Sequence, residues 1–305
     1  MARERRGSYY LSRIIKAGQL NKETLLGAIS NSATVLVGKY AWTITDVKFF
    51  ERDNQVVYAF GKLSKYSLEG TVKIVGKQGK KKIETDLVQP NLIEASSPFV
   101  YIPEFSGIAY LHVWNKIERE VFARRFSTII EANFDNFFVE CKIEPITDLH
   151  KFVERLMSIE SFIEISAKVR PPNPLFGRVW ENLKEYLEHR QATEMSVKER
   201  GDENYPLNSN LLKHIQGLTS QSEEKRYTPN DPVDITDAAI LMATDGYGDG
   251  KIIGIEKETQ TTITLKISEK HINFLFGREP HPDDLFENAY KQFKRISNER
   301  NMEHK

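Results

Sequence analysis

The stretch that decides the fold, Ser106 to Pro174, begins with the strand-like run Gly107-Ile-Ala-Tyr-Leu-His-Val-Trp. Apolar residues at helical spacing follow over 118–132, with charged residues opposite them. A second strand, Phe137-Phe-Val-Glu-Cys-Lys-Ile-Glu-Pro, stops at Pro145, and a helix over 149–156 leads to a third strand over 162–169. Three strands joined by two helices predict an α/β sandwich of ferredoxin-like character.

The flanking segments complete a prediction of the α+β class in three parts. Residues 1–105 form a β-rich N-terminal domain, because β-branched and aromatic runs alternate with turn-like breaks as in antiparallel meanders. A basic arm and a short helix from Asn21 precede these runs. Residues 106–190 form the ferredoxin-like domain. Residues 191–305 hold a polar linker, a hairpin over 251–267 and a closing helix over 282–296, while 234–243 fits a capped helix and a buried strand equally.

Composition limits the classes of protein to consider. Lys plus Arg and Asp plus Glu both number 43, so a nucleic-acid surface must be a local patch. Cys141 is the single cysteine, which excludes an internal disulfide and fits a reducing compartment. No apolar run has the length of a signal peptide or of a membrane span, so we expect a cytoplasmic location.

A lysine-rich segment gives the clearest indication of a partner. Between Lys62 and Lys82 there are seven lysines and one acid, Glu69, a balance of 7 − 1 = +6. Such lysines contact phosphates and give salt-dependent, sequence-independent affinity, although edge lysines also keep a solvated hairpin soluble. A second basic pair lies in the helix over 118–132. The predicted nucleic-acid-binding residues are Lys73, Lys77, Lys80, Lys81, Lys82, Arg124 and Arg125.

Catalytic patterns are weak, so we assign no catalytic residue, no metal ligand and no cofactor. Glu140 and Lys142 have the Glu-x-Lys spacing of some metal-dependent nucleases, but alternating strands produce such pairs routinely. The run Asp245-Gly-Tyr-Gly-Asp-Gly places Asp245 and Asp249 four residues apart, where a divalent cation or an ordinary glycine-rich turn would explain them. A metal-dependent nuclease using these residues stays open as an alternative.

The central block resembles the RexA-like exclusion proteins and related abortive-infection proteins of anti-phage defence. The similarity is carried by Gly107-Ile-Ala-Tyr, the helix around Phe126, Val139-Glu-Cys-Lys-Ile-Glu-Pro-Ile and Leu156-Met-Ser-Ile-Glu-Ser-Phe-Ile-Glu-Ile, over roughly 65 residues. This resemblance implies a homodimeric, cytoplasmic protein that binds DNA without strong sequence preference. It supplies no catalytic residues.

The leading functional hypothesis is therefore a DNA-binding component of a bacterial anti-phage defence or exclusion system. A membrane protein or a phage protein is a further expected partner in such a multi-component system. A third alternative is a protein-interaction module that senses a phage protein through an exposed sheet edge.

Overall fold

A computed structural model describes residues 5–78, 81–134, 138–171, 175–221 and 226–304. Its larger sheet has eight strands in the order β13-β1-β6-β5-β4-β3-β2, and β7 pairs with the second half of β1. The strands are β1 (Arg6–Gly18), β2 (Val35–Val37), β3 (Tyr40–Arg52), β4 (Gln55–Gln78), β5 (Lys81–Ile102), β6 (Gly107–Leu111), β7 (Val139–Pro145) and β13 (Asn273–Gly277).

Helices cover both faces of this sheet. On one face α1 (Lys22–Ser30) and α2 (Arg119–Ala132) bury an apolar layer that contains Phe99, Phe122 and Phe126. On the other face lies α7 (Pro282–Glu299), whose Phe293 stacks on Phe105 of the single turn η1 (Pro103–Phe105). The amphipathic helix predicted over 118–132 and the closing helix predicted over 282–296 are therefore confirmed as α2 and α7.

The smaller sheet has four antiparallel strands in the order β10-β8-β11-β12. Its helices pack on one face of the sheet. The other face is open to solvent and bears polar side chains that alternate along β8. The elements are β8 (Ile159–Val169), β10 (Met195–Arg200), β11 (Gly248–Glu256), β12 (Thr262–Lys266), α3 (Leu149–Met157), α4 (Glu181–His189), α5 (Leu211–Thr219), α6 (Ile235–Met242), η2 (Arg178–Trp180), the π-turn η3 (Ala243–Tyr247) and η4 (Ile267–Glu269).

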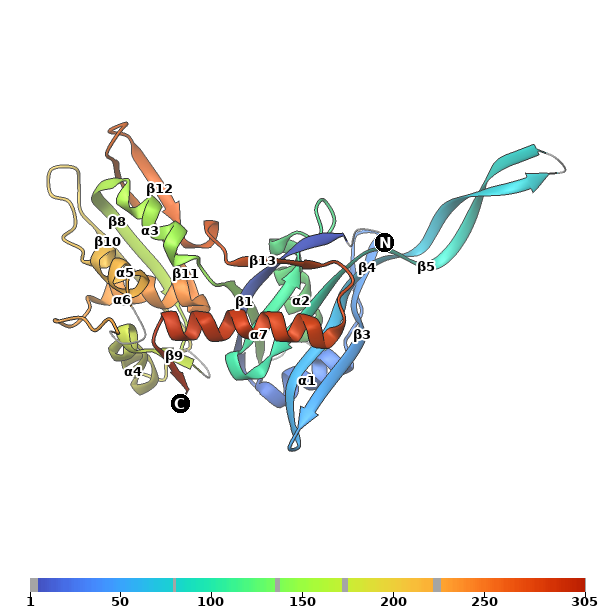
Figure 1. The fold of residues 1–305 in the computed structure, drawn as a ribbon, viewed down its shortest axis with the longest axis horizontal. Coiled ribbons are helices and arrows are strands. Elements are labelled where there is room, and N and C mark those ends of the chain that lie inside the picture. Colours follow the sequence, from blue (N-terminus) through green and yellow to red (C-terminus); the bar gives the residue numbers. More distant parts are fainter. Residues whose placement is uncertain (1–4, 79–80, 135–137, 172–174, 222–225, 305) are drawn as a thin grey trace.

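The two sheets share one apolar core, and α7 runs beside both of them (Figure 1). The short strand β14 (Met302–His304) pairs with β9 (Leu175–Gly177) next to this junction. No helix in the described part of the chain is long and apolar enough to cross a membrane.

The α+β class is confirmed, but the central block is not one ferredoxin-like sandwich. Its first two strands, β6 and β7, belong to the larger sheet, and its third strand, β8, belongs to the smaller one. The expected boundary after residue 105 also separates β5 from β6, which are hydrogen-bonded neighbours. The reason is β1, a strand that the sequence pattern did not predict: it pairs with β6 and β7 and so draws both into the larger sheet.

The ambiguous segment over 234–243 forms the helix α6, buried along almost its whole length. The hairpin predicted over 251–267 is confirmed as β11 and β12. The linker contains the additional strand β10, which pairs with β8 although most of its side chains are exposed.

A buried histidine makes the stability of this fold depend on pH. His271 is 7% exposed, and its Nε2 donates to the carbonyl oxygen of Leu11 at 2.6 Å. Burial lowers the pKa of His271 to about 3. Because the unfolded chain binds a proton with a pKa near 6.5, the fold is most stable above that pH and loses stability as pH falls toward 3.

We therefore expect the free energy of unfolding to fall by up to about 1.4 kcal/mol per pH unit between roughly pH 6 and 4 from this residue. Urea titrations at pH 7, 6, 5 and 4 measure it. His271→Gln should flatten the dependence, whereas His281→Gln, at a residue with an exposed side chain, should leave it unchanged. An identical slope in the wild type and in His271→Gln would contradict this assignment.

Candidate nucleic-acid interface

Strands β4 and β5 extend beyond the body of the protein as a two-stranded ribbon (Figure 1). Strand β3 accompanies β4 only as far as the pair Tyr40 and Ser67. From Glu69, opposite Pro90, to Gln78, opposite Lys81, β4 pairs with β5 alone. We call this segment, residues 69–90, the arm. The meander expected here is confirmed, but the extension of one hairpin away from the body was not anticipated.

The predicted lysines divide along the arm. Lys73 lies in its middle, is exposed, and forms an ion pair with Glu84 at 3.6 Å. Lys77 is opposite Lys82, and Lys81 is opposite Gln78, at the far end of the ribbon. The backbone of these three lysines is described, whereas their side chains and the whole of Lys80 lie outside the described residues. Strand register therefore brings Lys77, Lys81 and Lys82 together at the tip.

A second basic group lies at the foot of the arm, on the face of the sheet that α2 covers. The ammonium of Lys65 lies 3.8 Å from the ring centre of Tyr40 and 5.7 Å from that of Trp42. Lys39 approaches the same tyrosine at 5.4 Å, and the guanidinium of Arg125 lies 5.6 Å from Trp42. We call these residues, with the neighbouring Arg124, the base cluster: Lys39, Tyr40, Trp42, Lys65, Arg124 and Arg125.

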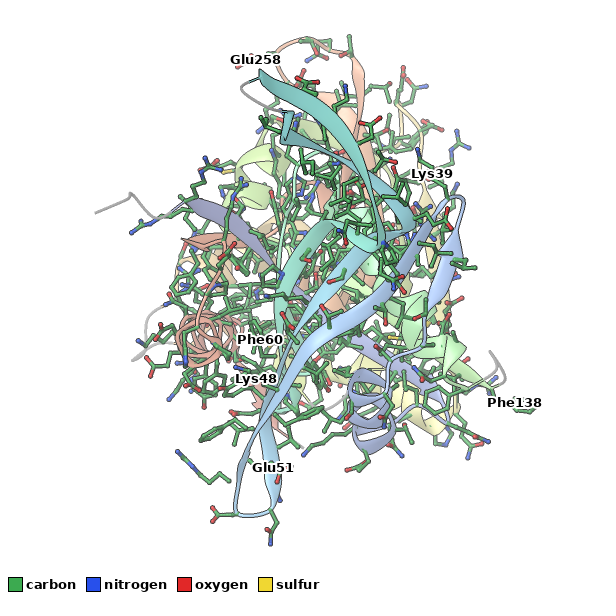
Figure 2. The ribbon with its side chains drawn as sticks, turned by 90° about the vertical axis from the view of Figure 1, so that its right-hand side faces the viewer. Lys39, Lys48, Glu51, Phe60, Phe138 and Glu258 are labelled. Carbon is green, nitrogen blue, oxygen red and sulfur yellow. The ribbon has the colours of Figure 1, made fainter. Side chains whose placement is uncertain are left out.

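Local structure explains why these residues meet. Trp42 is directly opposite Lys65 in the β3–β4 pair, so their side chains are on the same face. A register irregularity in the β4–β5 pair follows at Lys65 and Tyr66, where the ribbon leaves the body. Arg125 reaches Trp42 from α2, whose apolar side packs onto the same layer. Figure 2 views the molecule from the arm side and labels Lys39 beside the root of the ribbon.

The four cations of the base cluster form no ion pair with a carboxylate of the described residues. Among the described residues, no Asp or Glu oxygen lies within 4.0 Å of Lys39, Lys65, Arg124 or Arg125. Their neighbours are compensated, since Lys62 pairs with Asp46 at 2.7 Å. Partial burial and the adjacent Arg124 lower the pKa of Arg125, as expected where like charges are close together. The base cluster is therefore an electropositive surface that also presents aromatic rings.

Lysines on the open face of the smaller sheet show the opposite arrangement. The buried carboxylate of Glu164 lies 2.8 Å from Lys198 and 3.2 Å from Lys251. Lys168 pairs with Glu194 at 2.6 Å. These ion pairs depress the pKa of both Glu164 and Glu194. That face is charged but locally compensated, so it is a weaker candidate for binding phosphates.

The structure therefore brings Arg125 to the foot of the arm, apart from the lysines at its tip. Lys39, Tyr40, Trp42 and Lys65 were not predicted as site residues. A sequence signal for them existed. In Lys39-Tyr-Ala-Trp the two aromatic residues are two positions apart, so their rings share one face of a strand, and a lysine-bearing strand follows in the sequence.

The residues considered for a nuclease do not assemble into a metal site. Glu140 is occupied by an ion pair with Lys142. Asp245 is buried and accepts from Arg300 at 2.7 Å and from Trp180 at 2.7 Å, whereas Asp249 is exposed on β11. In the described part of the chain, no three His, Cys, Asp or Glu residues come together as metal ligands. Cys141 is buried, and burial raises the pKa of its thiol to about 12.

Comparison with known proteins assigns the chain to a family. No curated protein matches it. A family model described as a domain of unknown function, DUF4747, matches residues 21–225. This match covers more than half of the chain and includes the arm, the base cluster and α2, while β1, β13 and α7 lie outside it. On this evidence the chain belongs to the DUF4747 family.

Proposed function

We propose that this protein binds nucleic acid, with DNA as the expected ligand, through phosphate contacts that do not depend on sequence. The observation that carries the proposal is the base cluster, where four cations without an ion-pair partner among the described residues lie at the root of a lysine-tipped ribbon. Cations of this kind displace the counterions condensed on the phosphate backbone. The proposed setting is a cytoplasmic component of bacterial anti-phage defence, as the RexA-like resemblance implies.

Two separated basic groups suit a long polyanion better than a small ligand. The arm spans about ten residue pairs, which at roughly 3.3 Å per residue places its tip about 30 Å from the base cluster. Phosphates repeat every few ångströms along a strand, so one nucleic acid molecule can contact both groups. The compensated open face of the smaller sheet has no such continuation.

A homodimer is part of this proposal, with the arm as its contact surface. Isolated two-stranded ribbons are marginally stable in water, and an exposed apolar patch commonly marks a protein contact. Aliphatic side chains that are 40–69% exposed lie on both faces of the arm, Ile74 and Leu87 on one face and Val75 and Val88 on the other. In the proposed dimer a second arm, related to the first by a two-fold axis, covers these side chains.

The test of the base cluster is a pair of charge reversals. Lys65→Glu with Arg125→Glu is expected to weaken binding to a 30-nucleotide DNA by about tenfold or more at 0.1 M salt. On a duplex, the slope of log affinity against log salt should become shallower by about 0.9 for each phosphate that the variant no longer neutralises. Fluorescence anisotropy of labelled DNA over a range of salt concentrations measures both quantities.

Lys294→Glu is the matched control, because this residue is exposed on α7, on the opposite face of the larger sheet. Lys294→Glu changes the net charge by the same amount as each single substitution of the double variant, and it should have little effect on affinity. Binding that is unchanged in the double variant, or weakened equally by Lys294→Glu, would remove the base cluster from the interface.

A further inference from the structure

One tryptophan is exposed to solvent in a way that folding does not explain. Trp114 is 72% exposed, whereas Trp42 and Trp180 are 4% and 2% exposed, and the chain has three tryptophans. An indole ring is among the largest apolar surfaces that a protein can bury, and its exposure costs free energy of hydration. A ring left in water on a well-ordered turn is therefore a candidate contact for a ligand.

The turn that carries Trp114 is tightly constructed. The backbone N–H of Val113 donates to Ile117 at 2.9 Å, and the N–H of Ile117 donates back to Val113 at 2.8 Å. Asn115, next to the tryptophan, adopts the left-handed conformation with a φ of 57° that asparagine tolerates in turns. The indole is thus presented from a closed loop between β6 and α2, so little conformational entropy is lost when a ring stacks on it.

Rings and cations continue from this turn into the body. His112 lies 5.9 Å from the indole, Tyr10 lies 5.8 Å from His112, and the guanidinium of Arg119 lies 5.1 Å from the Tyr10 ring. These rings meet in tilted and edge-to-face arrangements, so they support the turn while the face of the exposed indole is left for a nucleobase to stack on.

A short series of contacts joins the turn to the base cluster. The ammonium of Lys116 lies 3.5 Å from Glu94, and the hydroxyl of Ser67 donates to the same carboxylate at 3.3 Å. Ser67 is in turn opposite Tyr40, a ring of the base cluster. The turn that carries Trp114 is therefore linked through Lys116 to the foot of the arm, beside the proposed phosphate contacts.

The charges beside Trp114 separate its role from that of the base cluster. The cations Lys116 and Arg119 are balanced by Glu94 on the neighbouring strand β5 and by Glu118 and Glu120 on their own segment. The turn therefore supplies an apolar stacking surface and adds little to phosphate attraction. Stacking and phosphate binding should consequently respond differently to salt.

We propose that Trp114 is a base-stacking site and that the ligand carries unpaired nucleotides at the foot of the arm. This inference rests on the proposed function and specifies its substrate class. In a continuous duplex, bases are stacked on one another and offer no free face to an indole, whereas unpaired bases do.

The experiment compares oligo(dT) with a blunt duplex of equal length. Trp114→Ala should weaken oligo(dT) binding by about tenfold, leave duplex binding unchanged and preserve the salt slope. Trp114→Phe should retain most of the affinity. Oligo(dT) should also quench the tryptophan emission of the wild type, and this quenching should be largely absent in Trp114→Phe, which isolates the signal of the exposed indole.

The two proposals fail in different ways. If Trp114→Ala binds oligo(dT) as tightly as the wild type while Lys65→Glu with Arg125→Glu loses affinity, the stacking site is wrong and the phosphate interface stands. Equal losses on oligo(dT) and duplex would overturn the preference for unpaired bases. If the wild type binds neither nucleic acid at low salt, both proposals are wrong.

Discussion

Replacement of Asp245 by alanine is expected to lower the free energy of unfolding by about 3–5 kcal/mol, because it leaves buried cations without their counter-charge. Asp245 is 5% exposed and lies where the two sheets meet. Its carboxylate accepts from Arg300 and from the indole nitrogen of Trp180, each at 2.7 Å. Its backbone carbonyl accepts from Arg13 at 3.1 Å. Both arginines are at most 3% exposed.

The surrounding backbone prevents the two arginines from reaching water once the carboxylate of Asp245 is removed. Arg13 and Arg300 are also held by carbonyl oxygens of Phe105, Thr244 and Thr147, so neither guanidinium can turn toward water without breaking other hydrogen bonds. Gly246, beside Asp245, has a φ of 87°, and a Cβ there would lie 2.7 Å from Arg13. The cluster is therefore a fixed junction between β1, η3 and the end of α7.

Asp249 is the matched control. It lies four residues away and is exposed on β11, so Asp249→Ala should change stability by no more than about 0.5 kcal/mol. Urea unfolding of both variants at pH 7 measures the contrast. Similar stabilities for the two variants would show that the buried carboxylate is not the counter-charge of Arg13 and Arg300.

The same cluster shows what the sequence could predict and what it could not. Local periodicity is sufficient for α2, α7 and the hairpin of β11 and β12, because each depends on neighbours within a few residues. The position of β1 depends on β13, more than 250 residues away, and on β7, more than 120 residues away. No local pattern records such pairings, so β6 and β7 were placed with β8 instead of with β1.

The candidate interface also has a part that the sequence could predict and a part that it could not. The lysine-rich hairpin was predictable, since charge runs and turn residues are local features. The base cluster was not, because Lys65, Trp42 and Arg125 come from three elements whose meeting depends on strand register and on helix packing. Asp245 and Asp249 also carry identical side chains, and burial alone gives the first a structural role.

Removal of the arm is expected to produce the largest loss of nucleic-acid binding. Residues 69–90 can be replaced by Asn-Gly, which closes a two-residue hairpin between Leu68 and Asn91. The base cluster and the apolar core are left in place, because the described side chains of the arm are mostly exposed and the ribbon projects away from the body (Figure 1). The thermal unfolding midpoint should therefore change little.

Affinity for oligo(dT) should fall by about a hundredfold at low salt, because the deletion removes, besides Lys73, four lysines that lie within six residues of the sequence, Lys77, Lys80, Lys81 and Lys82. The salt slope should fall by up to about 0.7 per lysine that pairs with a phosphate on a single strand.

Replacement of these four lysines by glutamine in the full-length chain separates charge from shape. If the glutamine variant loses the affinity but keeps the dimer, whereas the arm deletion loses both, the lysines bind phosphates and the aliphatic side chains hold the second copy. Light scattering coupled to gel filtration reads the oligomeric state, and a deletion variant that binds with wild-type affinity and slope would show that the arm has no part in the interface.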